Sequence, residues 1–288
     1  MAMTTATPAS LTVTAPAKLN LFLHVTGRRA DGYHTLESLM VALDYGDTIS
    51  LARRDDGRIV RVSELPGVPP ESDLAVRAAC ALRDATGTAL GVDLAIVKRI
   101  PQGGGLGGGS SDAASVLLAL NRLWRLDLPR ERLMCIGAAL GADVPFFLFG
   151  SPALARGAGE RLTAMTVPLR YAAVVVPRAA VPTATVFGAP ELTRNAPSAK
   201  MDVFSEAYGR NDLAAVAAAR FPAVAEALEA LSRVAVGPGG ARMTGSGSCV
   251  YALFDSREAA RAALAAMPVG TRGFVGRTLA RHPLAGFA

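Results

Sequence analysis

Polar and apolar residues alternate near the N-terminus and predict two consecutive strands, over residues 11–15 and 17–25. Because the side chains of a strand point alternately to opposite faces, one face of the second strand would carry Lys18, Asn20, Phe22 and His24. The other face would carry Leu19, Leu21, Leu23 and Val25. The polar face would hold an ammonium and an amide one pleat apart, either on a solvated edge strand or in a functional site.

Similar patterns predict the other elements and an α+β fold, with helices packed on sheets. Runs rich in β-branched residues predict strands over residues 44–51, 58–63, 92–97, 171–176 and 273–279, and a strand that ends at Phe254. Helical spacing of apolar residues predicts helices over residues 73–84, 111–124, 129–140, 202–218, 222–232 and 256–266. Residues 183–197 read as a loop, and a Gly/Ala/Pro-rich stretch at 150–170 predicts a soft domain boundary.

Side chains that accept hydrogen bonds stand at the start of two of these helices. Ser72 or Asp73 would cap the first helix, and Ser110 or Ser111 would cap the second.

Composition narrows the class of protein. The chain is 51% hydrophobic, which allows a sizeable core, but no apolar run reaches the roughly 18 residues that a membrane span needs. Residues 1–10 lack the features of a signal peptide. The three cysteines, Cys80, Cys135 and Cys249, have neither metal-site nor disulfide spacing, which fits a reducing cytosol. We therefore expect a cytoplasmic protein.

Charge points to small anionic partners. The formal net charge is +6, but the basic residues are scattered and form no Lys/Arg-rich run. This argues against a nucleic-acid surface and favours attraction of anionic small molecules. The oligomeric state is not indicated.

The most informative segment is a glycine-rich loop at residues 101–114, in which Leu106 is the one residue from 103 to 109 that is not glycine. Such a run is entropically costly, and a flexible linker is one explanation. The predicted strand before the loop and the predicted helix after it favour an anion-binding site instead. Backbone N–H groups can approach an anion closely there, and the helix N-terminus adds partial positive charge. The loop therefore predicts a phosphate site, although no Gly-Lys-Ser/Thr follows as in a Walker A loop.

Asp143 stands in a predicted turn between Gly141 and Pro145, directly before the apolar run 144–149, which we interpret as buried core. Its carboxylate is either a structural turn residue or a partly desolvated base.

Two more segments carry candidate chemistry. The Asp31-Gly32 turn exposes Tyr33 and His34, a pair that could equally pack on the surface or in the core. Residues 244–248 form a second glycine loop that leads into a strand.

Four separated segments together resemble the signature regions of the GHMP small-molecule kinases: residues 16–21, 101–114, 140–145 and 244–248. A further segment, residues 27–36, contains Ala-Asp-Gly-Tyr-His. It resembles the members of this family whose substrate is a cytidine diphosphate-linked methylerythritol. The resemblance covers nearly the whole chain. The glycine loops are shared across the family, whereas residues 30–34 are specific to that branch.

The resemblance implies a two-domain α+β fold with the active site in the cleft between the domains. Residues 1–160 would form the N-terminal ATP-binding and catalytic domain, and residues 161–288 the C-terminal substrate-binding domain. It also implies ATP-dependent phosphorylation of the 2-hydroxyl of the erythritol, a step of the non-mevalonate route to isoprenoid precursors.

Motif matches assign roles by residue. Lys18 and Asp143 would be the catalytic pair. The substrate would contact Asn20, Tyr33, His34, Thr185 and Phe187. ATP would contact Lys98, Pro101, Gln102, Gly103, Gly104, Gly105, Leu106, Gly107, Gly108, Gly109, Ser110 and Ser111. The supporting second loop would contribute Gly245, Ser246 and Gly247.

These roles agree with the chemistry of phosphoryl transfer, which needs positioning and charge neutralisation. Asp143 would accept the hydroxyl proton. Lys18 would keep Asp143 ionised and stabilise the transferring group. Mg²⁺ would bridge the phosphates with one hydroxyl, from Ser110 or Ser111, and its other ligands are unassigned.

The chain departs from the family pattern at a few positions. Asp73 and Asp112 stand where asparagine is usual, and Ser246-Gly247-Ser248 replaces a Thr-Gly-Ala version. The resemblance implies that the residue at position 73 contacts the adenosine of ATP. A carboxylate does not donate a hydrogen bond, so Asp73 leaves that contact open.

Two alternatives stay open at this point. Another kinase of the family, for mevalonate, homoserine or a sugar, would share the glycine loops but not residues 30–34. A non-catalytic nucleotide-binding regulator would need neither Lys18 nor Asp143.

Overall fold

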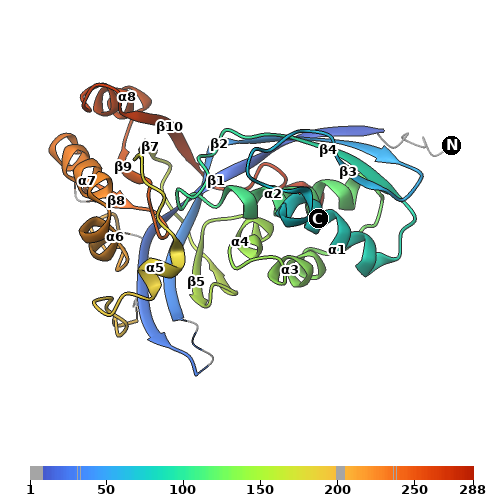
Figure 1. The fold of residues 1–288 in the computed structure, drawn as a ribbon, viewed down its shortest axis with the longest axis horizontal. Coiled ribbons are helices and arrows are strands. Elements are labelled where there is room, and N and C mark those ends of the chain that lie inside the picture. Colours follow the sequence, from blue (N-terminus) through green and yellow to red (C-terminus); the bar gives the residue numbers. More distant parts are fainter. Residues whose placement is uncertain (1–8, 31, 33, 199–204, 236, 238) are drawn as a thin grey trace.

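The computed structural model describes residues 9–30, 32, 34–198, 205–235, 237 and 239–288. Its central feature is a long antiparallel hairpin of β1 (Ser10–Arg28) and β2 (His34–Arg54). The hairpin runs between two groups of helices, α1 to α4 on one side and α6 to α8 on the other (Figure 1). One end of the hairpin packs in the core of one half, through residues such as Val13 and Ile49, and the end nearer its turn packs in the core of the other half, through residues such as Leu23.

β2 organises the sheet because both of its edges are paired. One edge pairs with β1 along its length. The other pairs in turn with β5 (Ala153–Gly157), β10 (Arg272–Leu279) and β4 (Gly91–Val97). The described strands form one ten-stranded sheet, completed by β3 (Ile59–Arg61), β6 (Arg161–Ala164), β7 (Tyr171–Val176), β8 (Arg242–Met243) and β9 (Val250–Phe254).

The helices of the first half pack around α2 (Gly108–Leu123), which is buried from Ser111 to Asn121. A helix buried on all sides belongs in the middle of a core. Around it lie α1 (Leu74–Thr86), α3 (Arg130–Ala138), α4 (Val144–Phe149) and the 3₁₀ turn η1 (Pro70–Ser72).

The second half has its own core under α5 (Thr183–Phe187), α6 (Ala214–Arg220), α7 (Pro222–Val234) and α8 (Arg257–Ala265). Leu23 and Val25 of β1 belong to this core. The C-terminal turn η2 (Ala285–Phe287) returns to the first half, where Leu284 and Phe287 join the core around α2. The hairpin and the C-terminus thus tie the two halves together.

Several predicted elements are confirmed and others need correction. The strand at 171–176 and the Asp73 cap are confirmed, since Asp73 Oδ1 accepts from Ala75 N at 2.9 Å. The two N-terminal strands are one continuous strand, β1. The predicted cap by Ser110 or Ser111 is wrong. Helix α2 begins at Gly108, and Gly107, with φ of 72°, stands at its N-cap.

Two further segments are short helices. The apolar run after Asp143 is α4, with Pro145 in its first turn, where a missing N–H costs nothing. The loop at 183–197 begins with α5. The helix expected near 202–218 begins, within the described residues, at Ala214.

Candidate active site

Two cavities meet at the glycine loop. The first, of about 370 Å³, contains Asp143 in its wall, and we call it the Asp143 cavity. The second, of about 380 Å³, contains Lys98, and we call it the Lys98 cavity. The residues that line both are Gly103, Gly105, Gly107 and Ser110. The loop predicted to bind phosphate is therefore the shared wall of two chambers, each of the size that a small ligand needs.

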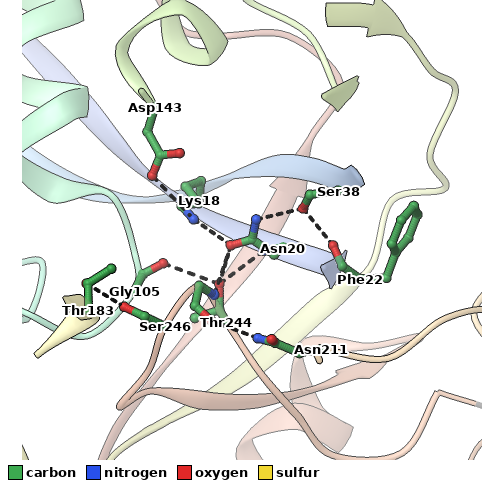
Figure 2. Close-up of polar contacts among 11 residues, drawn as sticks. Lys18, Asn20, Phe22, Ser38, Gly105, Asp143, Thr183, Asn211, Thr244 and Ser246 are labelled. Carbon is green, nitrogen blue, oxygen red and sulfur yellow. Dashed lines mark hydrogen bonds and ion pairs between the residues drawn. The ribbon is translucent and has the colours of Figure 1, made fainter. Parts of the chain in front are cut away.

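Asn20 is the centre of a polar network in the floor of the Asp143 cavity (Figure 2). Its Oδ1 accepts from Lys18 Nζ at 2.5 Å and from Gly245 N at 2.9 Å. Its Nδ2 donates to Ser38 Oγ at 2.8 Å, and Ser38 donates in turn to Phe22 O at 2.6 Å. The amide therefore has partners on both sides and holds the Lys18 ammonium at a fixed place.

The predicted alternation of β1 holds for Lys18 and Asn20 but fails beyond them. Asn20 pairs with Met40, but Phe22 pairs with Leu39, so the register shifts between the two residues. Leu23, not Phe22, lines the cavity. A β-bulge adds one residue to a strand and inverts the faces after it, which periodicity alone does not reveal.

Asp143 reaches the network from the start of α4. Its Oδ2 lies 3.5 Å from Lys18 Nζ. The Lys18 side chain is 4% exposed and that of Asp143 is 38% exposed. The carboxylate is thus held beside a buried ammonium while it stays open to the cavity, which favours a functional carboxylate over a purely structural turn residue.

The two glycine loops interlock through close backbone approach. A Cβ at Gly105 would lie 2.1 Å from Thr244 O, and one at Gly104 would lie 2.6 Å from Cys249 Sγ. Cys249 N donates to Gly104 O at 3.1 Å, and Lys18 N donates to Leu106 O at 2.9 Å. The glycines therefore serve two purposes, an exposed backbone for an anion and a tight fit against the second loop and β1.

The two serines after the glycines differ in exposure. Ser110 lines both cavities. Ser111 is fully buried, and its Oγ has no hydrogen-bond partner within the described residues. Of the two hydroxyls, that of Ser110 is the one that a ligand in either cavity can meet.

Lys98, one of the residues expected to contact ATP, lines its cavity but is also held by two carboxylates. Its Nζ donates to Asp112 Oδ2 at 2.6 Å and to Asp47 Oδ2. Asp47 Oδ1 also accepts from the backbone of Arg99 at 2.5 Å and Ile100 at 2.8 Å. This Asp47–Lys98–Asp112 cluster joins the strand end before the glycine loop to the helix start after it.

Burial and charge shift the titration of this cluster. Burial raises the pKa of Asp112 to about 7, and the Asp47 charge adds to this while Lys98 opposes it. Burial acts to lower the pKa of Lys98, but the two carboxylates together hold it above its ordinary value. The ammonium is therefore the charged centre of the cluster.

Asp73 is used by the fold. Besides capping α1, it pairs with Arg61 at 2.8 Å, and both side chains are nearly buried. Asp73 also lines the Lys98 cavity. A carboxylate at this position thus has two internal partners, the backbone of α1 and the Arg61 guanidinium.

The residues predicted to bind the substrate are brought together only in part. The ring of His34 lies 5.1 Å from that of Phe187, and Phe187 lines the Asp143 cavity. Tyr33 lies outside the described residues. Thr185 is exposed and does not line the cavity, whereas Thr183 does and shares a hydrogen bond of 2.8 Å with Ser246 Oγ.

Sequence reasoning missed four supporting residues. Ser38 orients the side chain of Asn20. The backbone of Asn20 is held by Tyr251, which donates to Asn20 O at 2.8 Å, and by Thr244 Oγ1, which accepts from Asn20 N at 3.0 Å. Asp47 anchors Lys98. Side chains alternate along a strand, so Ser38 lies on the same face of β2 as Met40. This alternation is the signal that could have indicated Ser38. An isolated carboxylate in a strand, as at Asp47, is itself a signal of a buried partner.

No helix within the described residues is long and apolar enough to cross a membrane.

Comparison with known proteins first defines the class. Residues 73–151 match the GHMP kinases N terminal domain, and residues 194–268 match the GHMP kinases C terminal domain. The two matches contain the glycine loop, Asp143 and the second glycine loop. The chain is a GHMP kinase.

Individual relatives narrow the class further. A 4-diphosphocytidyl-2-C-methyl-D-erythritol kinase of Cupriavidus metallidurans is 53% identical over 95% of this chain and 94% of its own length. A crystal structure of 4-(cytidine 5'-diphospho)-2C-methyl-D-erythritol kinase is 36% identical, with a TM-score of 0.80 over 93% of this chain and 99% of its own. A homoserine kinase of Cytophaga hutchinsonii, 19% identical with a TM-score of 0.68 over 96% of this chain and 97% of its own, shares the fold. The chain belongs to the 4-diphosphocytidyl-2-C-methyl-D-erythritol kinase family.

The close approach of Lys18 to Gly107, where a Cβ would have little room, gives a first prediction. Gly103 and Gly107 have similar φ values, 66° and 72°, but a Cβ at Gly103 meets nothing within 4 Å. A Cβ at Gly107 would lie 3.0 Å from Lys18 Cγ. Both alanine variants bear the left-handed strain of about 1–2 kcal/mol. We expect Gly107→Ala to lose about 1–3 kcal/mol more stability through overpacking, and to lower kcat. Urea unfolding and steady-state turnover measure both, and equal effects of the two variants would contradict a packing role for Gly107.

The Asp47–Lys98–Asp112 cluster gives a second prediction. Lys98→Met leaves two carboxylates without their cation and should cost about 3–5 kcal/mol of unfolding free energy. Lys98→Met with Asp112→Asn should recover only a small part of this loss, because the pKa of Asp112, already about 7, rises further without Lys98 and leaves little charge on that carboxyl to remove. Urea denaturation of both variants and of Asp112→Asn tests this. A Lys98→Met variant of normal stability with weakened ATP binding would show that Lys98 serves the nucleotide and not the fold.

Proposed function

We propose that the protein transfers the γ-phosphoryl group of ATP to the 2-hydroxyl of 4-diphosphocytidyl-2-C-methyl-D-erythritol, giving the 2-phosphate and ADP. This is a step of the non-mevalonate, or methylerythritol phosphate, route to isoprenoid precursors. The observation that carries the proposal is the meeting of two cavities at the glycine loop, with Lys18 and Asp143 in the wall of one of them. Family membership supplies the substrate.

ATP would occupy the Lys98 cavity, with its triphosphate along Gly103 to Ser110. The loop lies at the N-terminus of α2, a helix of 16 residues, whose backbone N–H groups and dipole favour an anion. The terminal phosphate would then lie at the wall shared with the Asp143 cavity. Phosphoryl transfer requires this alignment of donor and acceptor more than it requires covalent chemistry.

Asp143 would act as the general base. Its partly exposed carboxylate can accept the proton of a hydroxyl bound in the cavity. Lys18, held by Asn20, would place its ammonium between Asp143 and the phosphate and stabilise the charge on the transferring group. A fixed ammonium suits this role because it needs little reorganisation during the reaction.

The Ser110 hydroxyl would help to hold a Mg²⁺ ion, and that ion would supply charge neutralisation for the phosphates of ATP. The residues fit such an ion, since the Ser110 hydroxyl lies at the shared wall. Within the described residues no group of three or more His, Cys, Asp or Glu side chains could hold a metal by itself. Mg²⁺ commonly binds through few protein ligands together with substrate phosphates and water.

The cytidine would lie at the other end of the Asp143 cavity, against Phe187 and His34. Tyr33, Thr185 and the second loop, Gly245 to Gly247, complete the proposed contacts, with Thr183 as an added candidate from the cavity wall. We also propose that residues 1–160 form the ATP-binding and catalytic domain and residues 161–288 the substrate-binding domain. The two family matches fall on either side of that division.

A coupled ADP-release assay over a panel of acceptors tests the function. The panel is the cytidyl substrate, mevalonate, homoserine and galactose. We expect kcat/KM for the cytidyl substrate to exceed the others by on the order of 10⁴ or more, because buried polar groups reject substrates that leave them unpaired. Turnover of mevalonate, homoserine or galactose at a comparable rate would overturn the proposal.

Asp143→Asn tests the base directly. We expect kcat to fall on the order of 10²-fold or more, with the fold and ATP binding retained. Lys18→Arg should also be damaging, because a forked guanidinium does not replace a compact ammonium. The matched control is Asp55→Asn, at an exposed acid that lines neither cavity. Near-normal kcat in both site variants would refute the catalytic pair.

A further inference from the structure

Arg194 contacts both His34 and Phe187, the two described residues expected to bind the cytidine. Its Nε donates to His34 Nε2 at 3.1 Å. Its Nη2 donates to Phe187 O at 3.0 Å and to Ala189 O at 2.6 Å, and its Nη1 donates to Leu192 O at 3.0 Å. One half-buried guanidinium thus binds an imidazole and the backbone of the segment that follows α5.

The two rings that Arg194 connects come from different parts of the chain. His34 begins β2, and Phe187 ends α5. Their ring centroids are 5.1 Å apart with an interplanar angle of 34°. Phe187 lines the Asp143 cavity, whereas Arg194 does not. Arg194 therefore acts on the cavity only through the residues that it holds.

The contact with His34 determines where the imidazole proton lies. A guanidinium donates hydrogen bonds and never accepts them, so His34 Nε2 must offer its lone pair. A neutral ring that accepts at Nε2 carries its proton on Nδ1. The surroundings favour the neutral ring, because burial, then the charges of Arg194 and Arg28, lower the pKa of His34.

We propose that Arg194 is a positioning residue for recognition of the substrate base. It fixes His34 as a neutral ring with an Nδ1–H donor, and it fixes the segment that carries Phe187 beside that ring. The inference rests on the proposed function for the identity of the base. Cytosine offers unprotonated acceptors at N3 and O2, whereas uracil carries a proton at N3, so a ring locked as a donor suits cytosine.

The experiment compares Arg194→Met with a matched control, Arg220→Met. Arg220 is an arginine of the same half of the molecule that pairs with Glu191 at 2.8 Å and lines neither cavity. We expect Arg194→Met to raise KM for the cytidyl substrate about tenfold, the scale of one lost hydrogen bond or ordered contact. KM for ATP and kcat should stay within about twofold of the wild type. The control should change none of the three.

A spectroscopic measurement on the free protein separates positioning from general damage. The chain has three histidines, so long-range ¹H–¹⁵N spectra of the imidazoles are simple, and the His34→Gln variant assigns the His34 signals. We expect the Nδ1–H form of His34 in the wild type and in Arg220→Met, and its loss in Arg194→Met.

The outcomes are distinct. An unchanged His34 tautomer and unchanged KM in Arg194→Met would overturn the proposal, and so would equal losses for ATP and the cytidyl substrate. If the wild type itself failed to phosphorylate the cytidyl substrate, the proposed function would fall. The spectra would then still decide whether Arg194 sets the state of His34.

Discussion

The side-chain amide of Asn20 is the contact on which the arrangement of the active site depends. Through it, β1 is bonded to Ser38 of β2 and to the second glycine loop at Gly245, while Lys18 is held on the same oxygen. The backbone of Asn20 adds Thr244 and Tyr251. An asparagine suits this place because it both donates and accepts. Aspartate could not donate to Ser38, and leucine would leave several buried groups unpaired.

The interlocked glycine loops show why the first loop was easy to find and hard to interpret fully. Its composition predicted an anion site, and its place at the N-terminus of α2 agrees with that. Its contact with Thr244 and Cys249 was not predictable, because those residues lie far along the chain and nothing local marks the approach. A glycine required by a distant backbone is indistinguishable in sequence from one required by a ligand.

The sequence predicted the fold class, the family and most elements, because periodicity and turn residues are local signals. It failed where one residue changes a register. The irregularity after Asn20 exchanges the faces of β1 and replaces Phe22 with Leu23 in the cavity. Likewise, Ser110 and Ser111 looked like helix caps, but Gly107 holds that position since its φ of 72° lets the loop turn into the helix. The His34–Arg194 contact joins residues 160 positions apart, beyond any local pattern.

Two of the chain's three lysines stand at the glycine loop, and the exposure of their partners separates their roles. The Asp47 and Asp112 carboxylates that hold Lys98 are 0% and 4% exposed, so both are engaged in fastening the ends of the loop, while Lys98 also lines the Lys98 cavity. The Asp143 carboxylate beside Lys18 is 38% exposed and lies 3.5 Å from it, too far for a tight hydrogen bond. A carboxylate that lies beside a buried ammonium and is still open to the cavity can be reached by a ligand there. The same two residue types thus fasten the loop in one place and leave a carboxylate open to the Asp143 cavity in the other, and the difference comes from how the surrounding chain covers the carboxylates.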